Sequence, residues 1–367
     1  MILEQNKILA AFSCDSSVVI KPLGCGNINV TYLVETKPEP FVLQRISGSV
    51  FPDPVAVMDN FEVICTHFQS IESTLRSGFI MSKPVYTKDE RLFFKDSSGH
   101  YWRAQRYVNT AAVSRLNSIV QAKSVGRTLA RFHLLFQKLH LGNIKDPLPG
   151  FHHLHRYLKE YDQIESKLQI KTDETALFCK NSIEIYREQA LTIEHARANN
   201  TLTIQPIHGD PKVDNFIFSE VGEAVGLLDL DTVGAGIIYH DLGDCLRSAC
   251  STSQESDGTN VQPGFNLQLC RGILEGYFAC EATNHSEIQP DYIYDGLFAI
   301  CFELAVRFYT DHLQGNVYFR VEEDGRNADR ALNQFRLCQD IARQESDIRQ
   351  LVEFIYRKKD LTPVYGK

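Results

Sequence analysis

The segment IHGDPKVDNFIF, residues 207–218, is followed a few residues later by VGLLDLDT, residues 225–232. Runs of apolar and β-branched residues border both segments, which is typical of short buried strands. A polar loop lies between the runs, and the second run ends in two carboxylates one residue apart. We therefore expect a strand, a charged loop, a hairpin and a second group of acids to lie close together.

The charged residues of these two segments have a spacing that suits phosphoryl transfer. That reaction needs a carboxylate to orient the acceptor hydroxyl and take its proton, and hard oxygen ligands to hold Mg²⁺ against the phosphates. The pattern His208-x-Asp210-x-x-x-x-Asn215 has the spacing of a kinase catalytic loop. Asp229 follows after a short hairpin, where a kinase-like fold places its main magnesium carboxylate. A His-Gly-Asp turn alone is common, so the prediction depends on the whole block.

The composition is that of an ordinary globular protein. The chain has 367 residues, of which 43% are hydrophobic and 23% charged, and its formal net charge is -8. This apolar content is enough for a buried core and excludes a disordered chain. A general nucleic-acid partner is not expected, because it would need an excess of Lys and Arg. At this length two lobes around a cleft are the expected organisation.

Cysteine usage and the first residues indicate the cytoplasm. Ten cysteines are scattered without a C-x-x-C pair, so neither a zinc knuckle nor a redox pair is expected. The N-terminus shows no signal peptide, and no stretch approaches the ~18 apolar residues of a membrane helix. We expect free thiols, a cytoplasmic location and no membrane partner. The oligomeric state stays open.

Two kinds of periodicity divide the chain. Short strand-like runs separated by Gly, Pro and charged turns lie at residues 17–21, 28–34, 41–46, 83–87, 92–95 and 101–108. A helix is predicted among them at 54–77, with Asp53-Pro54 as its cap and first turn. Helical periodicity dominates at residues 114–140, 152–169, 173–197 and 239–357, interrupted by the block 203–231. We expect a strand-rich lobe, a hinge near 107–112 and a larger helical lobe.

Several further segments carry a family resemblance. The pattern His-Gly-Asp-x-x-x-x-Asn, an Asp after a hairpin, and a helix entered through Asp-Leu (YHDLGD, 239–244) resembles the aminoglycoside-phosphotransferase-like kinase superfamily. More closely, the chain resembles the N-acetylhexosamine 1-kinases. The segments behind that likeness are GCGNINVTY (24–32), VLQRI (42–46), VFPDP (50–54), MDN (58–60) and RFYTDHLQGNVYF (307–319). The resembling regions span about residues 20–340.

The resemblance implies a fold, a role for each lobe and roles for individual residues. The fold is α+β and protein-kinase-like, with a strand-rich nucleotide-binding lobe at 1–108 and a larger helical catalytic and acceptor-binding lobe at 109–367. ATP lies between the lobes. Asp210 is the catalytic base, and Asn215 and Asp229 hold Mg²⁺.

Four further residues of this block have supporting or alternative roles in this scheme. Lys212 could meet the transferring phosphoryl group, or it could be a solvated loop lysine. Asp231 could contact the acceptor substrate or support its neighbours, or it could be an ordinary turn carboxylate. We expect His208 to steady the loop through hydrogen bonds, and Asp241 to anchor it from the following helix.

The nucleotide side begins with a glycine-containing turn. Gly24, Gly26 and Asn27 lie between two predicted strands, where glycines let the backbone approach phosphates closely. We expect this turn to cover the phosphates. It is not a Walker A loop, because no Gly-Lys-Ser/Thr follows.

The remaining nucleotide contacts come from the third strand and the hinge. Gln44 has the register where many kinases place a lysine, but only its neighbour Arg45 carries charge, so Arg45 is the predicted phosphate cation. A one-residue shift would reverse the face on which the side chain lies. Asp59 and Glu62 are both open as its acidic partner. The backbone of Tyr107 and Val108 is expected to contact adenine, with ordinary strand core as the alternative for both residues.

The acceptor side is expected in the 307–319 segment. Arg307, Tyr309 and Tyr318 are candidates, because a sugar needs hydrogen-bonding groups and an aromatic face. A polycationic aminoglycoside would instead need a cluster of carboxylates, such as residues 322–324. Ordinary packing or surface roles stay open for all of these residues.

The predicted activity is Mg²⁺-dependent transfer of the γ-phosphoryl group of ATP to a small-molecule hydroxyl. The leading acceptor is the anomeric hydroxyl of an N-acetylhexosamine. An aminoglycoside, choline or homoserine kinase of the same superfamily is the alternative. A catalytically silent nucleotide-binding regulator is the alternative of another class, and the presence of Asp210, Asn215 and Asp229 argues against it.

Overall fold

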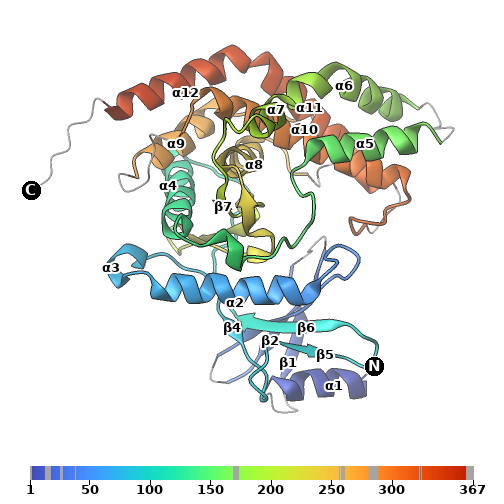
Figure 1. The fold of residues 1–367 in the computed structure, drawn as a ribbon, viewed down its shortest axis with the longest axis vertical. Coiled ribbons are helices and arrows are strands. Elements are labelled where there is room, and N and C mark those ends of the chain that lie inside the picture. Colours follow the sequence, from blue (N-terminus) through green and yellow to red (C-terminus); the bar gives the residue numbers. More distant parts are fainter. Residues whose placement is uncertain are drawn as a thin grey trace, which may run out of the picture.

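A computed structural model describes most of the chain. The described residues are 2–12, 18–24, 28–37, 39–167, 173–255, 257, 261–280, 288–321, 323 and 325–360. Figure 1 shows a strand-rich region at one end and a larger helical region at the other, the mixed α+β arrangement that the sequence predicts. The chain leaves the sheet after Arg106 and enters no helix until Ile119. The division at 108/109 stays a prediction.

The N-terminal region is a six-stranded sheet of antiparallel pairs in the order β1-β2-β3-β6-β4, with β5 also paired to β6. The strands are β1 (Val19–Pro22), β2 (Val30–Glu35), β3 (Phe41–Arg45), β4 (Pro84–Val85), β5 (Phe93–Lys95) and β6 (Tyr101–Arg106). Each strand falls within or beside a predicted run. All six predicted strand regions are therefore confirmed.

The pleat gives this sheet two unlike faces. Successive side chains of a strand point to opposite faces. Leu43 and Ala104 pack with Leu9 of α1 (Ile2–Ala11) in a small apolar core. Gln44 and Arg103, which are register partners on β3 and β6, lie on the other face. That second face is polar and looks toward the helical region.

The predicted helix at 54–77 is two helices. Asp53 caps α2 (Pro54–Ser70), because its Oδ1 accepts hydrogen bonds from the backbone N–H groups of Val55 and Ala56, both at 3.1 Å. The helix ends where Ile71 turns extended, with ψ of 142°. A short α3 (Ser73–Arg76) then follows. The apolar spacing that suggested one helix continues through a break in the backbone, so periodicity alone misplaced the end.

The C-terminal region is built from helices around one large apolar core. They are α4 (Ile119–Phe136), α5 (Leu154–Glu165), α6 (Glu174–Ala190), α7 (Thr192–Ala198), α8 (Ile238–Cys250), α9 (Leu267–Phe278), α10 (Asp291–Leu313), α11 (Arg326–Arg343) and α12 (Glu345–Asp360). A short 3-10 helix, η1 (Leu141–Asn143), follows α4. The predicted helices at 114–140 and 173–197 are shorter or divided in the structure.

Residues 205–236, which include the charged loop and the hairpin predicted above, form two small antiparallel strand pairs. β7 (Gln205–Ile207) pairs with β10 (Gly234–Gly236), and β8 (Phe216–Phe218) pairs with β9 (Ala224–Leu227). The loops between them contain the 3-10 turns η2 (Val213–Asn215) and η3 (Leu230–Thr232). The strand, loop and hairpin order predicted for residues 207–232 is confirmed.

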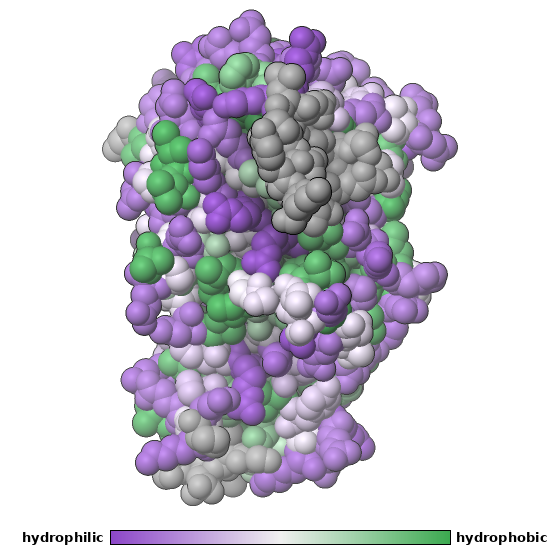
Figure 2. All heavy atoms as spheres, turned by 90° about the vertical axis from the view of Figure 1, so that its left-hand side faces the viewer, coloured by the Kyte–Doolittle hydropathy of each residue, from purple (hydrophilic) through white to green (hydrophobic). Residues whose placement is uncertain are grey.

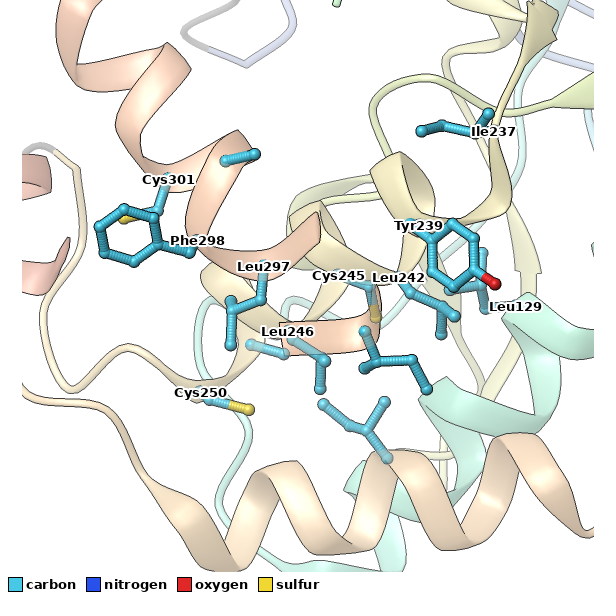
Figure 3. Close-up of a cluster of buried hydrophobic side chains, with 14 of the residues drawn as sticks. Leu129, Ile237, Tyr239, Leu242, Cys245, Leu246, Cys250, Leu297, Phe298 and Cys301 are labelled. Carbon is cyan, nitrogen blue, oxygen red and sulfur yellow. The ribbon is translucent and has the colours of Figure 1, made fainter. Parts of the chain in front are cut away.

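Helix α8 enters the core directly behind these loops. Figure 3 shows Leu242, Cys245 and Leu246 of α8 beside Leu297 of α10, with Leu129 of α4 nearby. All five side chains are fully buried. This packing holds α8 rigidly against the rest of the region, so a side chain at its N-terminal end can act as a fixed support.

Helices α4 and α9 approach so closely that only glycine fits between them. A Cβ atom on Gly126 would lie 1.9 Å from the backbone oxygen of Ile273. A Cβ atom on Gly276 would lie 2.0 Å from the backbone oxygen of Lys123. Since these neighbours are backbone atoms, no side-chain rotation relieves the clash.

The surface of the described residues is mixed. On the face drawn in Figure 2, hydrophilic residues cover much of the surface and apolar residues form small separate groups. Among the helices in the described ranges, none is long and apolar enough to cross a membrane. The cysteines of the described residues form no disulfide.

Candidate active site

Asp241, on α8, anchors the predicted catalytic loop (residues 208–215). Its carboxylate accepts the backbone N–H groups of His208 and Gly209, each at 2.7 Å. The same carboxylate pairs with His133 Nε2 at 2.9 Å, and His133 Nδ1 lies 2.8 Å from the hydroxyl of Tyr277. Burial works against ionisation, yet these hydrogen bonds hold the pKa of Asp241 below its usual value. The prediction that Asp241 anchors the loop is confirmed.

His208 links the loop to the neighbouring strand. The backbone N–H of Asp210 donates to His208 Nδ1 at 3.3 Å, so this nitrogen is the unprotonated one and Nε2 donates to the carbonyl of Leu228 at 2.9 Å. Burial lowers the pKa of His208, which keeps the ring neutral. His208 therefore steadies the loop through hydrogen bonds, as expected.

Asp210 lies at the centre of a small polar network. Lys212 Nζ is 2.9 Å from Asp210 Oδ2, and the Asn215 side-chain nitrogen donates to the same oxygen at 3.0 Å and to the Asp210 carbonyl at 2.7 Å. Burial alone would raise the pKa of Asp210, but the Lys212 ammonium holds it below its usual value. The group is therefore a carboxylate at neutral pH, with its orientation set by two donors.

Asp229 and Asn215 offer the oxygen atoms that a divalent cation needs. The amide nitrogen of Asn215 is engaged with Asp210, which leaves its amide oxygen to face a cation. Asp229 follows β9 with a left-handed φ of 57°, a conformation that residues other than Gly, Asn and Asp rarely adopt. Although Asp229 is exposed, desolvation and the nearby carboxylates of Asp231 and Asp210 raise its pKa.

The donor set fits magnesium bound together with a nucleotide. No group of three or more His, Cys, Asp or Glu side chains within the described ranges could hold a metal alone. Mg²⁺ commonly takes only one or two protein ligands and completes its shell with phosphates and water. One carboxylate and one amide oxygen, Asp229 and Asn215, are therefore a sufficient protein contribution.

Asp231 faces the N-terminal sheet rather than the acceptor side. Its Oδ1 lies 2.6 Å from Arg103 Nη2, and its Oδ2 accepts a hydrogen bond from the Asn29 side chain at 3.0 Å. It does not belong to the lining of the cavity beside Asp210. The structure therefore does not bring Asp231 together with the other predicted acceptor residues.

The predicted nucleotide residues are only partly described. Gly24 has a φ of 70°, and no atom lies within 4 Å of its Cβ position. Both features are compatible with a turn whose backbone approaches a phosphate closely. Gly26 and Asn27 lie outside the described residues. Tyr107 and Val108 directly follow β6, and the Val108 backbone forms no hydrogen bond with any described residue. A ligand could use those groups, so the predicted adenine contact stays a prediction.

The structure does not bring Arg45 into the polar face of the sheet. Arg45 follows Gln44 on β3, so its side chain leaves the strand on the side of Leu43, away from Gln44 and Arg103. The two acids considered as its partners are engaged elsewhere. Asp59 pairs with Lys145 at 2.7 Å, and Glu62 accepts the Tyr86 hydroxyl at 2.8 Å.

A cavity opens beside Asp210 between α8, α10 and the segment before α5. It contains the predicted residues Asp210, Lys212, Arg307 and Tyr318 together. The other charged lining residues are His152, Asp244, Arg247, Glu255 and Glu303. The aromatic lining residues besides Tyr318 are Phe151, Phe308 and Phe319. Tyr309, also considered from the sequence, is instead buried against Tyr161, with ring centroids 6.0 Å apart.

Arg307 is fixed in this cavity by aromatic rings. Its guanidinium lies 5.1 to 5.5 Å from the ring centroids of Phe151, Tyr157, Tyr318 and Phe319. Its Nη2 donates to the Tyr318 hydroxyl at 3.1 Å. Asp311 holds the opposing segment by accepting the backbone N–H of Tyr318 at 2.6 Å. Arginine and tyrosine are therefore presented to the cavity as one rigid unit.

A histidine joins this unit to the catalytic loop. His152 Nε2 lies 2.8 Å from the Gly209 carbonyl, and its Nδ1 lies 3.0 Å from Glu303 Oε1. Burial disfavours the charged ring, but Glu303 outweighs it and raises the pKa of His152. Glu303 in turn lies 3.7 Å from Arg307 Nη1. Hydrogen bonds of His152 thus connect the cavity to the loop that holds Asp210.

Sequence reasoning missed several lining residues. Asp244 lies within the segment 239–244 already singled out, and Glu303 precedes Arg307 by one helical turn, so both had a local signal. His152 and Glu255 had none, because each reaches the cavity from a loop. Arg247 joins the set by pairing with Asp244 at 2.8 Å and with Glu255 at 2.8 Å.

The strand-rich sheet beside a helical region and the match to a phosphotransferase family model together define a small-molecule kinase that phosphorylates a hydroxyl group. The chain belongs to the APH phosphotransferase enzyme family, whose model matches residues 19–280. With Asp210, Asn215 and Asp229 all in place, this membership argues against the catalytically silent regulator.

Solved structures share the fold at low identity. A microcompartment-associated aminopropanol kinase is 14% identical with a TM-score of 0.63, covering 95% of this chain and 98% of that one. An amicoumacin kinase in complex with AMP-PNP and Ca²⁺ is 14% identical with a TM-score of 0.53, covering 98% and 93%. An ethanolamine kinase from Plasmodium vivax is 12% identical with a TM-score of 0.55, covering 87% and 82%. Such identities establish the protein-kinase-like architecture and leave the acceptor open.

Proposed function

We propose that the protein transfers the γ-phosphoryl group of Mg²⁺-bound ATP to a sugar hydroxyl, the anomeric hydroxyl of an N-acetylhexosamine. Asp210 orients that hydroxyl and accepts its proton. Asn215 and Asp229 hold the metal against the phosphates, and Lys212 offsets charge on the transferring group. The amicoumacin kinase bound to AMP-PNP and Ca²⁺ supports a nucleotide and a divalent cation in this fold. A cytoplasmic reaction is part of the proposal.

The charge balance of the cavity carries the choice of a neutral acceptor. Its four carboxylates are Asp210, Asp244, Glu255 and Glu303. Each has a basic partner within 3.0 Å, namely Lys212 for Asp210, Arg247 for Asp244 and Glu255, and His152 for Glu303. Both ring nitrogens of His152 face acceptor oxygens, an arrangement that favours the protonated ring. Arg307 adds a further positive charge. A polycationic aminoglycoside would find no carboxylate without a basic partner in this cavity. A neutral polyol needs no such carboxylate.

One carboxylate oxygen is suited to a sugar hydroxyl. Asp244 is 5% exposed, and its Oδ2 has no hydrogen-bond partner among the described residues. Its Oδ1 is held by Arg247 Nε at 2.8 Å. A buried acceptor without a donor is costly, so a hydroxyl that donates to Asp244 Oδ2 would be bound selectively. The aromatic rings around Arg307 would cover the apolar face of the sugar ring.

A phosphorylation screen tests this proposal. ADP release is measured with N-acetylglucosamine, N-acetylgalactosamine, other hexoses, choline, homoserine and kanamycin, at two salt concentrations, and NMR of the product locates the phosphate. Asp210→Asn is the control for enzyme-dependent turnover. We expect the highest kcat/KM for a hexosamine and phosphate on the anomeric oxygen. A higher kcat/KM for kanamycin or choline at both salt concentrations would overturn the acceptor assignment and leave the kinase class standing.

A further inference from the structure

Arg103 places a buried guanidinium between the N-terminal sheet and the catalytic segment. The residue is 3% exposed, and its Nη2 lies 2.6 Å from Asp231 Oδ1. Its Nε and Nη2 donate to Gln44 Oε1 at 3.0 and 2.7 Å. The guanidinium also lies 5.5 Å from the ring centroid of Phe61 on α2. Contacts from β3, α2 and η3 therefore fix its position.

One end of this guanidinium is unused. Arg103 Nη1 is buried and forms no hydrogen bond with any residue in the described ranges. A buried N–H group without an acceptor carries a desolvation penalty, and the penalty is greater for a charged group. The planar fork of an arginine matches the oxygens of a phosphate. A buried guanidinium nitrogen without an acceptor, beside the catalytic segment, is thus suited to an anionic ligand that is not a protein side chain.

The strand register explains why the charge comes from β6. Gln44 and Arg103 are directly opposite each other on β3 and β6, so their side chains share the polar face of the sheet. Gln44 is neutral, and its amide oxygen is turned toward Arg103 and toward Gln105 Nε2 at 3.0 Å. Arg45 is excluded from that face by the pleat. Among the sheet residues on this side, Arg103 is the cation aimed at the catalytic segment.

The partner of Arg103 is itself informative. Asp231 stands two residues after Asp229, the assigned metal ligand, so Arg103 reaches the place where phosphates and metal would meet. Asp231 also accepts the side-chain amide of Asn29, which follows the glycine turn that starts at Gly24. The Asp231 carboxylate thus contacts both the Arg103 guanidinium and the Asn29 side-chain amide. Phosphate oxygens would satisfy the same two donors.

We propose that Arg103 binds the phosphates of the nucleotide, and that Asp231 holds its guanidinium in the nucleotide-free protein. On binding, phosphate oxygens take the place of the Asp231 carboxylate at the guanidinium, and Nη1 gains an acceptor. Arg103 is then the phosphate cation that the third strand does not supply. This inference rests on the ATP-binding part of the proposed function and is independent of the acceptor.

Equilibrium binding of a nucleotide series tests the assignment. Isothermal titration measures ATP, ADP and adenosine, each with Mg²⁺, on the wild-type protein, Arg103→Lys and Arg103→Gln. Removing charge-assisted hydrogen bonds should weaken ATP binding about 10- to 100-fold in Arg103→Gln. Adenosine binding should change less than about twofold, because adenosine has no phosphate. Arg103→Lys should retain part of the ATP affinity, since it keeps the charge and loses the fork.

Two matched substitutions complete the test. Arg106→Gln removes an arginine from the same strand that forms an exposed pair with Glu39 at 2.9 Å, and we expect no change in affinity. Arg45→Gln should likewise leave ATP binding unchanged. Equal losses for ATP and adenosine in the Arg103 variants would overturn the assignment, because they would indicate a structural tie only. Loss of ATP affinity in Arg45→Gln instead would also overturn it.

The outcomes separate this inference from the proposed function. If the wild-type protein binds no ATP, both fail. If it binds ATP and Arg103→Gln binds it equally well, only the Arg103 assignment fails. Adenosine binding shows that the cleft of each variant is folded. If Arg103→Gln does not fold, Arg103→Lys decides the question through its ATP-to-adenosine affinity ratio, which should fall several-fold.

Discussion

Substituting Asp241 by asparagine should disable the enzyme without touching any reacting atom. The carboxylate has two oxygens, and both accept hydrogen bonds from the catalytic loop or from His133. An asparagine of the same shape has one oxygen and one NH₂ group. Wherever the amide is placed, one backbone N–H of His208 or Gly209 faces a donor. The loop must then shift or leave that group unsatisfied.

The cost follows from the groups affected. A buried N–H left without an acceptor costs about 1–3 kcal/mol, and each hydrogen bond to a charged group contributes about 1.5–3 kcal/mol. Asp241 is fully buried, so solvent does not compensate. We expect the free energy of unfolding to fall by about 3–5 kcal/mol, which lies within the sum of these two contributions. A shift of ~1 Å at Asp210 should lower kcat about 10²-fold in the molecules that stay folded.

Urea unfolding followed by circular dichroism, together with kcat from ADP release, measures both effects. Asp340→Asn is the matched control. Asp340, on α11, is a buried carboxylate that accepts the backbone N–H of Phe265 at 2.6 Å. The control should lose stability and keep kcat. Unchanged stability and unchanged kcat in Asp241→Asn would refute the anchoring role. Equal loss of kcat in both variants would show that general destabilisation, and not loop position, lowers the rate.

Three further substitutions test the site and the packing. Asp210→Asn should reduce kcat by about 10²–10⁴-fold while ATP binding stays near normal, and a near wild-type rate would rule it out as the base. Asp229→Ala should abolish turnover and remove the dependence of ATP affinity on Mg²⁺, which titrations with and without the metal would show. Gly276→Ala should destabilise the protein by at least about 1–3 kcal/mol, since its Cβ would lie 2.0 Å from a backbone oxygen. Gly48→Ala, with open space at its Cβ, should be neutral in the same unfolding assay, and equal effects of the two would contradict the close helix contact.

Local sequence patterns were enough to predict most of the secondary structure of this protein. Alternating and β-branched runs identified the six sheet strands, because side chains on a pleated strand must alternate between core and solvent. Asp53-Pro54 identified the start of α2 through capping, which depends only on the four consecutive residues 53–56. The spacing of Asp210 and Asn215 predicted that the two side chains meet, because they lie five residues apart on one loop, and the Asn215 amide does contact Asp210. Helix ends were less accurate, as the break at Ile71 shows, since apolar spacing continues past it.

Tertiary structure alone decided which charges meet. Arg45 and Gln44 are neighbours in the sequence, yet the pleat sends their side chains to opposite faces, and only the pairing of β3 with β6 brings Arg103 beside Gln44. The contact of Arg103 with Asp231 depends on how the sheet is set against the catalytic segment. The cavity beside Asp210 likewise joins residues from α8, α10 and several loops. Periodicity reports which face of an element is buried, but the partner across that face is chosen by packing between elements far apart in the chain.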